Sequence, residues 1–104
     1  MAFQMRREDS PRSVRLLVSG DVDLNTTPDL LKSLKSAFKA GKREVIIDLE
    51  RVDHMDSSGV AALVEGVRDS RKTGVEFLLT KVPRSVFGVL DLAKLRDFFQ
   101  YREG

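Results

Sequence analysis

The stretch REVIIDLERVDHMDSSGVAALVEGV, residues 43–67, decides the fold. Val45, Ile46 and Ile47 are consecutive β-branched apolar residues, a pattern typical of a strand that is buried on both faces. From Val60 onward, apolar residues recur at the spacing of one helix face. We therefore expect strand 44–49 to lie inside a sheet, a loop over 50–56, and a helix near 57–72.

Strand and helix patterns also alternate on both sides of this stretch. Strand patterns cover 2–8 (weakly), 13–20, 75–80 and 97–101, and a short helix opens at Pro83. A further helix is expected to begin with Thr27 as N-cap and Pro28 as first residue, before a buried stripe of Leu30, Leu31, Leu34 and Phe38 and a stop at Gly41. The order β-β-α-β-α-β-α-β predicts one α/β domain over residues 1–104. We expect a four- to five-stranded mixed sheet with helices mainly on one face.

Composition limits the classes of function. Of 104 residues, 41% are hydrophobic and 33% charged, and eighteen basic residues are interspersed with sixteen acidic ones, which gives no clear basic patch for nucleic acid. The absence of cysteine excludes disulfides and thiolate metal sites. No apolar run suits a signal peptide or a membrane span. We expect a cytoplasmic protein that neither binds nucleic acid nor inserts into the membrane, and no metal site. The lysines of helix 27–41, Lys32, Lys35 and Lys39, are expected to be solvated.

The start of helix 57–72 combines Asp56, Ser57, Ser58 and Gly59. Asp and Ser are common at helix starts because they cap free amide groups, so capping alone is one interpretation. A reciprocal capping box would need Glu or Gln three residues after the serine, and neither serine meets that condition. Because a cap also needs only one hydroxyl, a functional site is the other interpretation.

A second acidic loop, GDVD at 20–23, also follows a strand and precedes a helix. If strands 13–20 and 44–49 are parallel neighbours, both loops lie at the same edge of the sheet, where sites of α/β domains are usually found. Asp21 or Asp23 would then approach Ser57.

Enzymatic interpretations find little support in the residues. Ser57 lacks the glycine two positions earlier that a nucleophile elbow needs, since Met55 stands there. His54 is the one histidine and has no second histidine as a partner, so it is expected to be an ordinary surface residue. DVDLN, residues 21–25, departs at Asn25 from the motif of aspartyl-phosphate phosphatases, and no Walker-type loop is present.

VIIDLERVDHMDSSGVAALV, residues 45–64, resembles the central motif of STAS domains, which occur in bacterial anti-sigma factor antagonists and at the ends of sulfate transporters. LLVSGDVDLNTTPDLLKSL resembles that family's first strand, loop and helix, and VPRSVFGVLDLAKLRDFF resembles its late helix and last strand. The similarity covers residues 13–99. Lys94 departs from it, because the family often has glycine at that position.

The resemblance implies an anti-sigma factor antagonist in a partner-switching circuit. A partner that is both anti-sigma factor and serine kinase, of the histidine-kinase-like ATPase type, would bind the unphosphorylated protein and phosphorylate Ser57. Phosphorylation would end the binding, and a separate serine phosphatase would reset it. ATP and magnesium belong to the kinase, so no cofactor is expected. The expected partner-binding residues are Asp21, Asp23, Asn25, Thr26, Asp56, Ser58, Gly59, Val60 and Ala62.

Two other functions remain open for a domain of this type. STAS domains also serve as cytoplasmic subunits of lipid-transport ABC systems, where they bind the ABC transporter ATPase and phosphorylation is not required. A third possibility is a scaffold component of a stress-sensing assembly. For the two hydroxyls, we expect Ser57 to reach solvent at the helix lip and Ser58 to serve as a cap or packing group.

Overall fold

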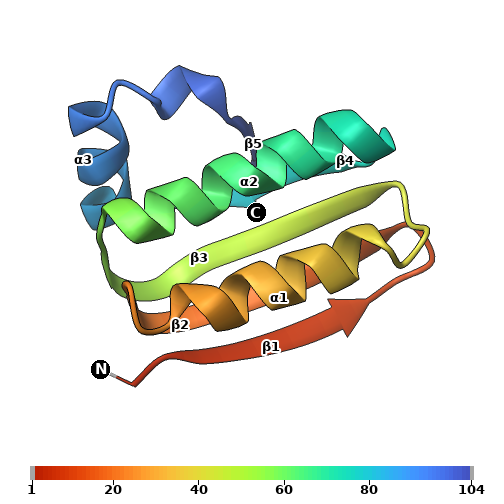
Figure 1. Ribbon diagram of the computed structural model, residues 1–104, viewed down its shortest axis with the longest axis horizontal. Helices are drawn as coiled ribbons and strands as arrows, with labels where there is room; N and C mark the ends of the chain where they lie inside the picture. The colour runs from red at the N-terminus through yellow and green to blue at the C-terminus, as the bar shows by residue number, and fades with distance from the viewer. Residues whose placement is uncertain (1, 104) are drawn as a thin grey trace.

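The computed structural model describes residues 2–103. Figure 1 shows helices lying in front of a twisted sheet. The elements are β1 (Gln4–Asp9), β2 (Ser13–Val22), α1 (Thr27–Phe38), β3 (Glu44–Met55), α2 (Ser57–Thr73), β4 (Glu76–Thr80), α3 (Arg84–Leu92), the 3-10 helix η1 (Arg96–Phe98) and β5 (Gln100–Arg102).

The sheet is mixed and has the strand order β1-β2-β3-β4-β5. β1 pairs antiparallel with β2, and the other neighbouring strands are parallel. β3 is central, which confirms the expectation from Val45, Ile46 and Ile47, all buried. The helices pack on one face of the sheet, and their apolar side chains form one core with those of the strands. The predicted α/β fold is therefore confirmed.

The expected loop over 50–56 is wrong, because β3 continues to Met55. Its second half pairs with the end of β2, from Ser19 opposite Arg51 to Val22 opposite Met55. The charged residues between these positions hid the strand pattern in the sequence. The longer strand carries the start of α2 to the same edge of the sheet as the end of β2.

The core lies between the sheet and the helices. Alternate residues of β2, Val14, Leu16 and Val18, point into it, and so do residues of α1, α2 and α3 such as Leu34, Leu63 and Leu90. α1 and α2 lie side by side across the sheet (Figure 1). Lys35 of α1 pairs with Asp69 of α2 at 2.8 Å, so the expectation that this lysine is merely solvated is wrong.

Two boundaries differ from the sequence expectations. Thr26, not Thr27, is the N-cap of α1, and its side chain makes no capping bond because its hydroxyl bonds to the preceding loop instead. The expected strand over 97–101 is divided between η1 and the short edge strand β5. Among residues 2–103, no helix is long and apolar enough to cross a membrane.

Candidate functional site

The two predicted loops meet at Asp56. β2 and β3 are parallel, so both strands deliver their following loops to one edge of the sheet. The amide of Asp56 donates to the carbonyl of Val22 at 3.1 Å, and the backbone of Leu24 helps to lower the pKa of the Asp56 carboxylate. The loop over 21–26 therefore lies against the first turn of α2, as the sequence predicted.

Asp56 is the N-cap of α2. Its Oδ1 accepts the amide of Ser58 at 2.9 Å and that of Gly59 at 3.3 Å, which satisfies two of the free amides of the first turn. The hydroxyl of Ser58 also donates to Oδ1, at 2.5 Å. The Ser58 hydroxyl, and then the amides of Gly59, Ser58 and Leu24, hold the pKa of Asp56 below its ordinary value. The cap is thus the carboxylate of Asp56. Ser58 was expected to be a cap or packing group; it supports the carboxylate through its hydroxyl and does not itself cap the helix.

Ser57 stands apart from this network. It is the first residue of α2, its side chain is exposed, and within residues 2–103 its hydroxyl has no hydrogen-bond partner. Because the amides of Ser58 and Gly59 already bond to Asp56, it is the positive end of the helix dipole that favours an anion at this helix start. The arrangement leaves an accessible hydroxyl at the start of α2.

The loop before α1 is held by its own side chains. Oδ1 of Asp23 accepts the amide of Asn25 at 2.9 Å, and the hydroxyl of Thr26 accepts the amide of Asp23 and donates to the carbonyl of Asp21. These bonds form a compact turn that presents Leu24, 75% exposed, and Asn25 to solvent.

The two acidic candidates are placed differently. Asp21 lies opposite His54 in the register of β2 and β3, and its carboxylate is 3.2 Å from Nδ1 of that exposed histidine. Asp23 belongs to the turn whose next residue, Leu24, helps to lower the pKa of Asp56. Asp23 is therefore the acid whose turn adjoins the site, while Asp21 faces the side chain of His54 on β3.

Three expected contact residues are buried. Val60 is 5% and Ala62 2% exposed, and Gly59 is also buried, so these residues belong to the core and do not offer a contact surface. A Cβ at Gly59 would lie 2.5 Å from Cγ of Met55 and 3.0 Å from a methyl group of Val22. The absence of a side chain at Gly59 therefore allows the ends of β2 and β3 to pack against the helix.

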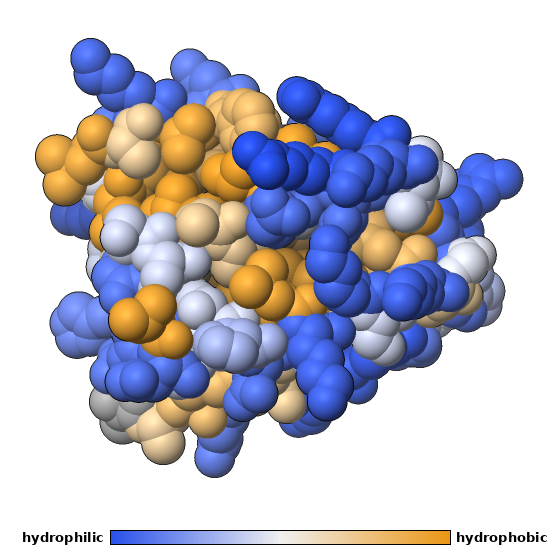
Figure 2. Space-filling model, in the orientation of Figure 1, coloured by the Kyte–Doolittle hydropathy of each residue, from blue (hydrophilic) through white to orange (hydrophobic). Residues whose placement is uncertain are grey.

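Exposed apolar residues near the site were missed in the sequence. Leu24 is exposed in the turn before α1 and Ala61 is exposed near the start of α2; elsewhere, Leu92 of α3 is 88% exposed. In Figure 2, apolar side chains gather at the end of the molecule where α3 lies, while hydrophilic ones dominate the opposite end. The sequence did contain a signal for Leu24, because an apolar residue in an otherwise polar turn indicates an exposed contact residue. Among residues 2–103, no group of three His, Cys, Asp or Glu side chains could hold a metal ion.

A mixed sheet covered by helices on one face, with an exposed serine after its central strand, is the architecture expected of a small α/β domain of the STAS type. The STAS domain family model matches residues 3–103, so the chain belongs to the STAS family.

The chain is also similar to individual proteins and to solved structures. The anti-sigma-B factor antagonist of Staphylococcus aureus (strain NCTC 8325 / PS 47) is 26% identical over 87 residues, which cover 84% of this chain and 81% of the relative. An anti-sigma factor antagonist from Mycobacterium paratuberculosis has a similar structure, with a TM-score of 0.85 at 21% identity over 96% of this chain and 85% of that one. The phosphorylated form of SpoIIAA, a Bacillus cell fate determinant, superposes with a TM-score of 0.74 at 19% identity over 99% of this chain and 91% of that one.

Proposed function

We propose that this protein is an anti-sigma factor antagonist that works by partner switching. The unphosphorylated form binds an anti-sigma factor, and phosphorylation of Ser57 releases it. One observation carries the proposal: Ser57 is exposed and has no hydrogen-bond partner within residues 2–103, directly after the capping carboxylate of Asp56. The similarity to proteins named as anti-sigma factor antagonists supports it.

The charge of a phosphate explains how release would work. Phosphoserine adds a charge of about −1.5 to −2 near neutral pH. At Ser57 this charge would stand beside the ionised carboxylate of Asp56, which is held by the amides of α2. On a contact surface that also presents Leu24, a dianion would cost desolvation and repel acidic neighbours. The partner would dissociate while the domain stays folded.

The partner is proposed to be a serine kinase of the histidine-kinase-like ATPase type that is also the anti-sigma factor. It would supply ATP and magnesium, and a separate serine phosphatase would remove the phosphate. Because the circuit controls a sigma factor, the protein would act in the cytoplasm.

Incubation with the cognate kinase and ATP tests the proposal. One phosphate should be added and should map to Ser57 by peptide mass spectrometry. Ser57→Ala should abolish incorporation and keep kinase binding, since it adds no charge. Ser57→Asp should weaken binding, and Ser58→Ala is the matched control that should still be phosphorylated. Phosphate on Ser58 with Ser57 unmodified would refute the assignment of the site. Tight binding to an ABC transporter ATPase without phosphorylation would refute the antagonist function itself.

A further inference from the structure

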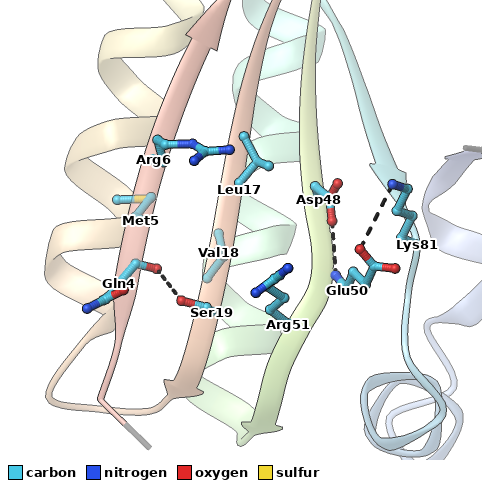
Figure 3. A pocket seen from close by; sticks show the side chains of 10 residues that line it. All are labelled: Gln4, Met5, Arg6, Leu17, Val18, Ser19, Asp48, Glu50, Arg51 and Lys81. Carbon is cyan, nitrogen blue, oxygen red and sulfur yellow. Dashed lines mark hydrogen bonds and ion pairs between the residues drawn. The ribbon is translucent and has the colours of Figure 1, made fainter.

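One face of the sheet carries no helix in the described part of the chain. Residues of β2 that alternate with the core positions, Arg15, Leu17 and Ser19, point to this open face. Figure 3 views the open face, with the helices visible behind the strands. Its side chains are free to meet a molecule from solution.

The open face is hollowed over β1, β2 and β3. Two adjoining depressions, of about 720 Å³ and 490 Å³, share Gln4, Ser19 and Arg51 in their walls. The register of β2 against β3 shifts here, between Leu17 and Ser19 and again between Gly20 and the next residue. Ser19 has a small side chain, whereas the space beside Gly20 is taken by the backbone of Ala2 and Phe3, the latter 3.0 Å from where a Cβ would stand. A volume of this size suits a small organic molecule.

Of the three carboxylates in the wall of the hollow, two are already engaged. Asp48 is 6% exposed and accepts the guanidinium of Arg15 at 3.3 Å and the amide of Glu50 at 3.0 Å. The carboxylate of Glu50 lies 3.9 Å from Nζ of Lys81. Asp48 and Glu50 therefore have cations or amides beside them, whereas Asp53 lines the smaller depression together with Arg51.

Two arginines of the hollow have unused hydrogen-bond donors. Within residues 2–103, the Arg51 guanidinium makes no hydrogen bond or ion pair, and Arg6 donates one bond, to Glu8 at 3.2 Å. Figure 3 shows Arg6 reaching from β1 over β2 beside Leu17, and Arg51 lying between β2 and β3. The two guanidinium groups approach the space over β2 from its two sides. Guanidinium groups match the paired oxygens of carboxylates and phosphates.

We propose that this hollow binds a small organic anion. Its carboxylate or phosphate would pair with Arg51 and Arg6, and its apolar part would rest on the half-buried side chain of Leu17. The site is separate from Ser57, because it lies on the open face and Ser57 begins a helix on the other side of the sheet.

An NMR titration of the full chain with three six-carbon probes tests the proposal. Hexanoate and hexyl phosphate should each shift the amide signals of Ser19, Gly20 and Arg51 saturably, and the tighter of the two identifies the preferred headgroup. Hexylammonium carries the same apolar chain with the opposite charge and should leave these signals unchanged. Acetate should bind more weakly than hexanoate, since it lacks the apolar chain that Leu17 would contact.

Substitutions then assign the charge. Arg51→Gln and Arg6→Gln should each weaken binding of the tighter anion by about tenfold, the effect of losing a charge-assisted pair. Arg68→Gln is the matched control, since Arg68 is an exposed arginine on α2, and it should bind like the wild type. The proposal is overturned if neither anion shifts these amides saturably, or if both hollow variants keep wild-type affinity with an unchanged dispersed spectrum.

Discussion

The hydroxyl of Ser58 donates to Oδ1 of Asp56 at 2.5 Å, while the hydroxyl of the adjacent Ser57 has no partner within residues 2–103. A single residue step therefore separates a serine that supports the helix cap from one that is available for modification. On a helix, successive side chains differ in direction by about 100°, which explains why only one of them can face the capping carboxylate. Under the proposed function, stability and signalling would depend on different hydroxyls.

Replacing the cap should cost stability. Asp56→Ala removes the acceptor for the amides of Ser58 and Gly59, and we expect a loss of about 0.5–2 kcal/mol in the free energy of unfolding, measured by urea denaturation. Asp53→Ala is the control, because Asp53 is an exposed acid of β3 outside the cap. Equal stability of the two variants would contradict the assignment of Asp56 as the cap.

Two helical glycines should respond in opposite directions to alanine. A Cβ at Gly66 would lie 2.5 Å from the ring of Phe77, which is buried and packs against Phe38. Gly66→Ala should therefore lower stability by about 1–3 kcal/mol through overpacking. A Cβ at Gly88 of α3 meets nothing within 4 Å, so Gly88→Ala should raise stability by about 0.5–1 kcal/mol through helix propensity. Thermal unfolding of both variants decides; stabilisation by Gly66→Ala would show that the α2–sheet packing is looser than described.

The end of α3 carries a strained lysine. Lys94 has φ 58, and its amide donates to the carbonyl of Asp91 while the amide of Leu95 donates to that of Leu90, the bond pattern of a Schellman cap. Glycine adopts this left-handed backbone without a steric penalty. Lys94→Gly should raise stability by about 0.5–1 kcal/mol, whereas Ala93→Gly, at a φ of −82, should lower it. Chemical denaturation measures both, and a loss in Lys94→Gly would rule out backbone strain at this position.

Acid should weaken the tie between β5 and β3. Arg102 reaches across β4 and binds both carboxylate oxygens of Glu44, at 2.7 Å and 2.6 Å, and this pairing holds the pKa of Glu44 below its ordinary 4.5. A lowered folded pKa gives stability that is complete above the ordinary value and is lost as pH falls through the lower folded value. Glu44→Gln should flatten the acid limb of a melting-temperature profile, and Glu103→Gln, an exposed control, should not. An unchanged acid limb in Glu44→Gln would exclude this pair as its source.

The sequence predicted most of the fold because the spacing of apolar residues was clear in the strands and helices that are fully buried. Val45, Ile46 and Ile47 indicated the central strand, and the spacing after Val60 indicated α2. The end of β3 was missed since Glu50 and its charged neighbours lie on exposed positions of a strand that pairs on one side only with β2. Alternation is lost there because the register shifts.

At the site, the sequence predicted which loops lie together, but it did not predict which side chains make the contacts between them. Parallel strands brought the turn of Asp23 to Asp56, as expected. Burial of Val60 and Ala62 could not be read from their types, because small apolar residues suit both a core and a contact surface. The role of Ser58 also depended on a rotamer, since either hydroxyl could in principle have reached the helix start.

The turn before α1 allows the charge of Asp23 to be separated from its structural role. Oδ1 of Asp23 accepts the amide of Asn25, so Asp23→Ala would remove both the charge and the turn. Asp23→Asn keeps an oxygen acceptor in the same place and removes the charge alone. If the charge helps the kinase to recognise the domain, Asp23→Asn should lower the rate of phosphate incorporation at Ser57 while the melting temperature stays unchanged, and Asp23→Ala should lower both. Asp29→Asn, an exposed acid in the first turn of α1, is the control for overall charge. Wild-type phosphorylation of Asp23→Asn beside slow phosphorylation of Asp23→Ala would mean that Asp23 acts through the shape of the turn, by presenting Leu24 to the partner.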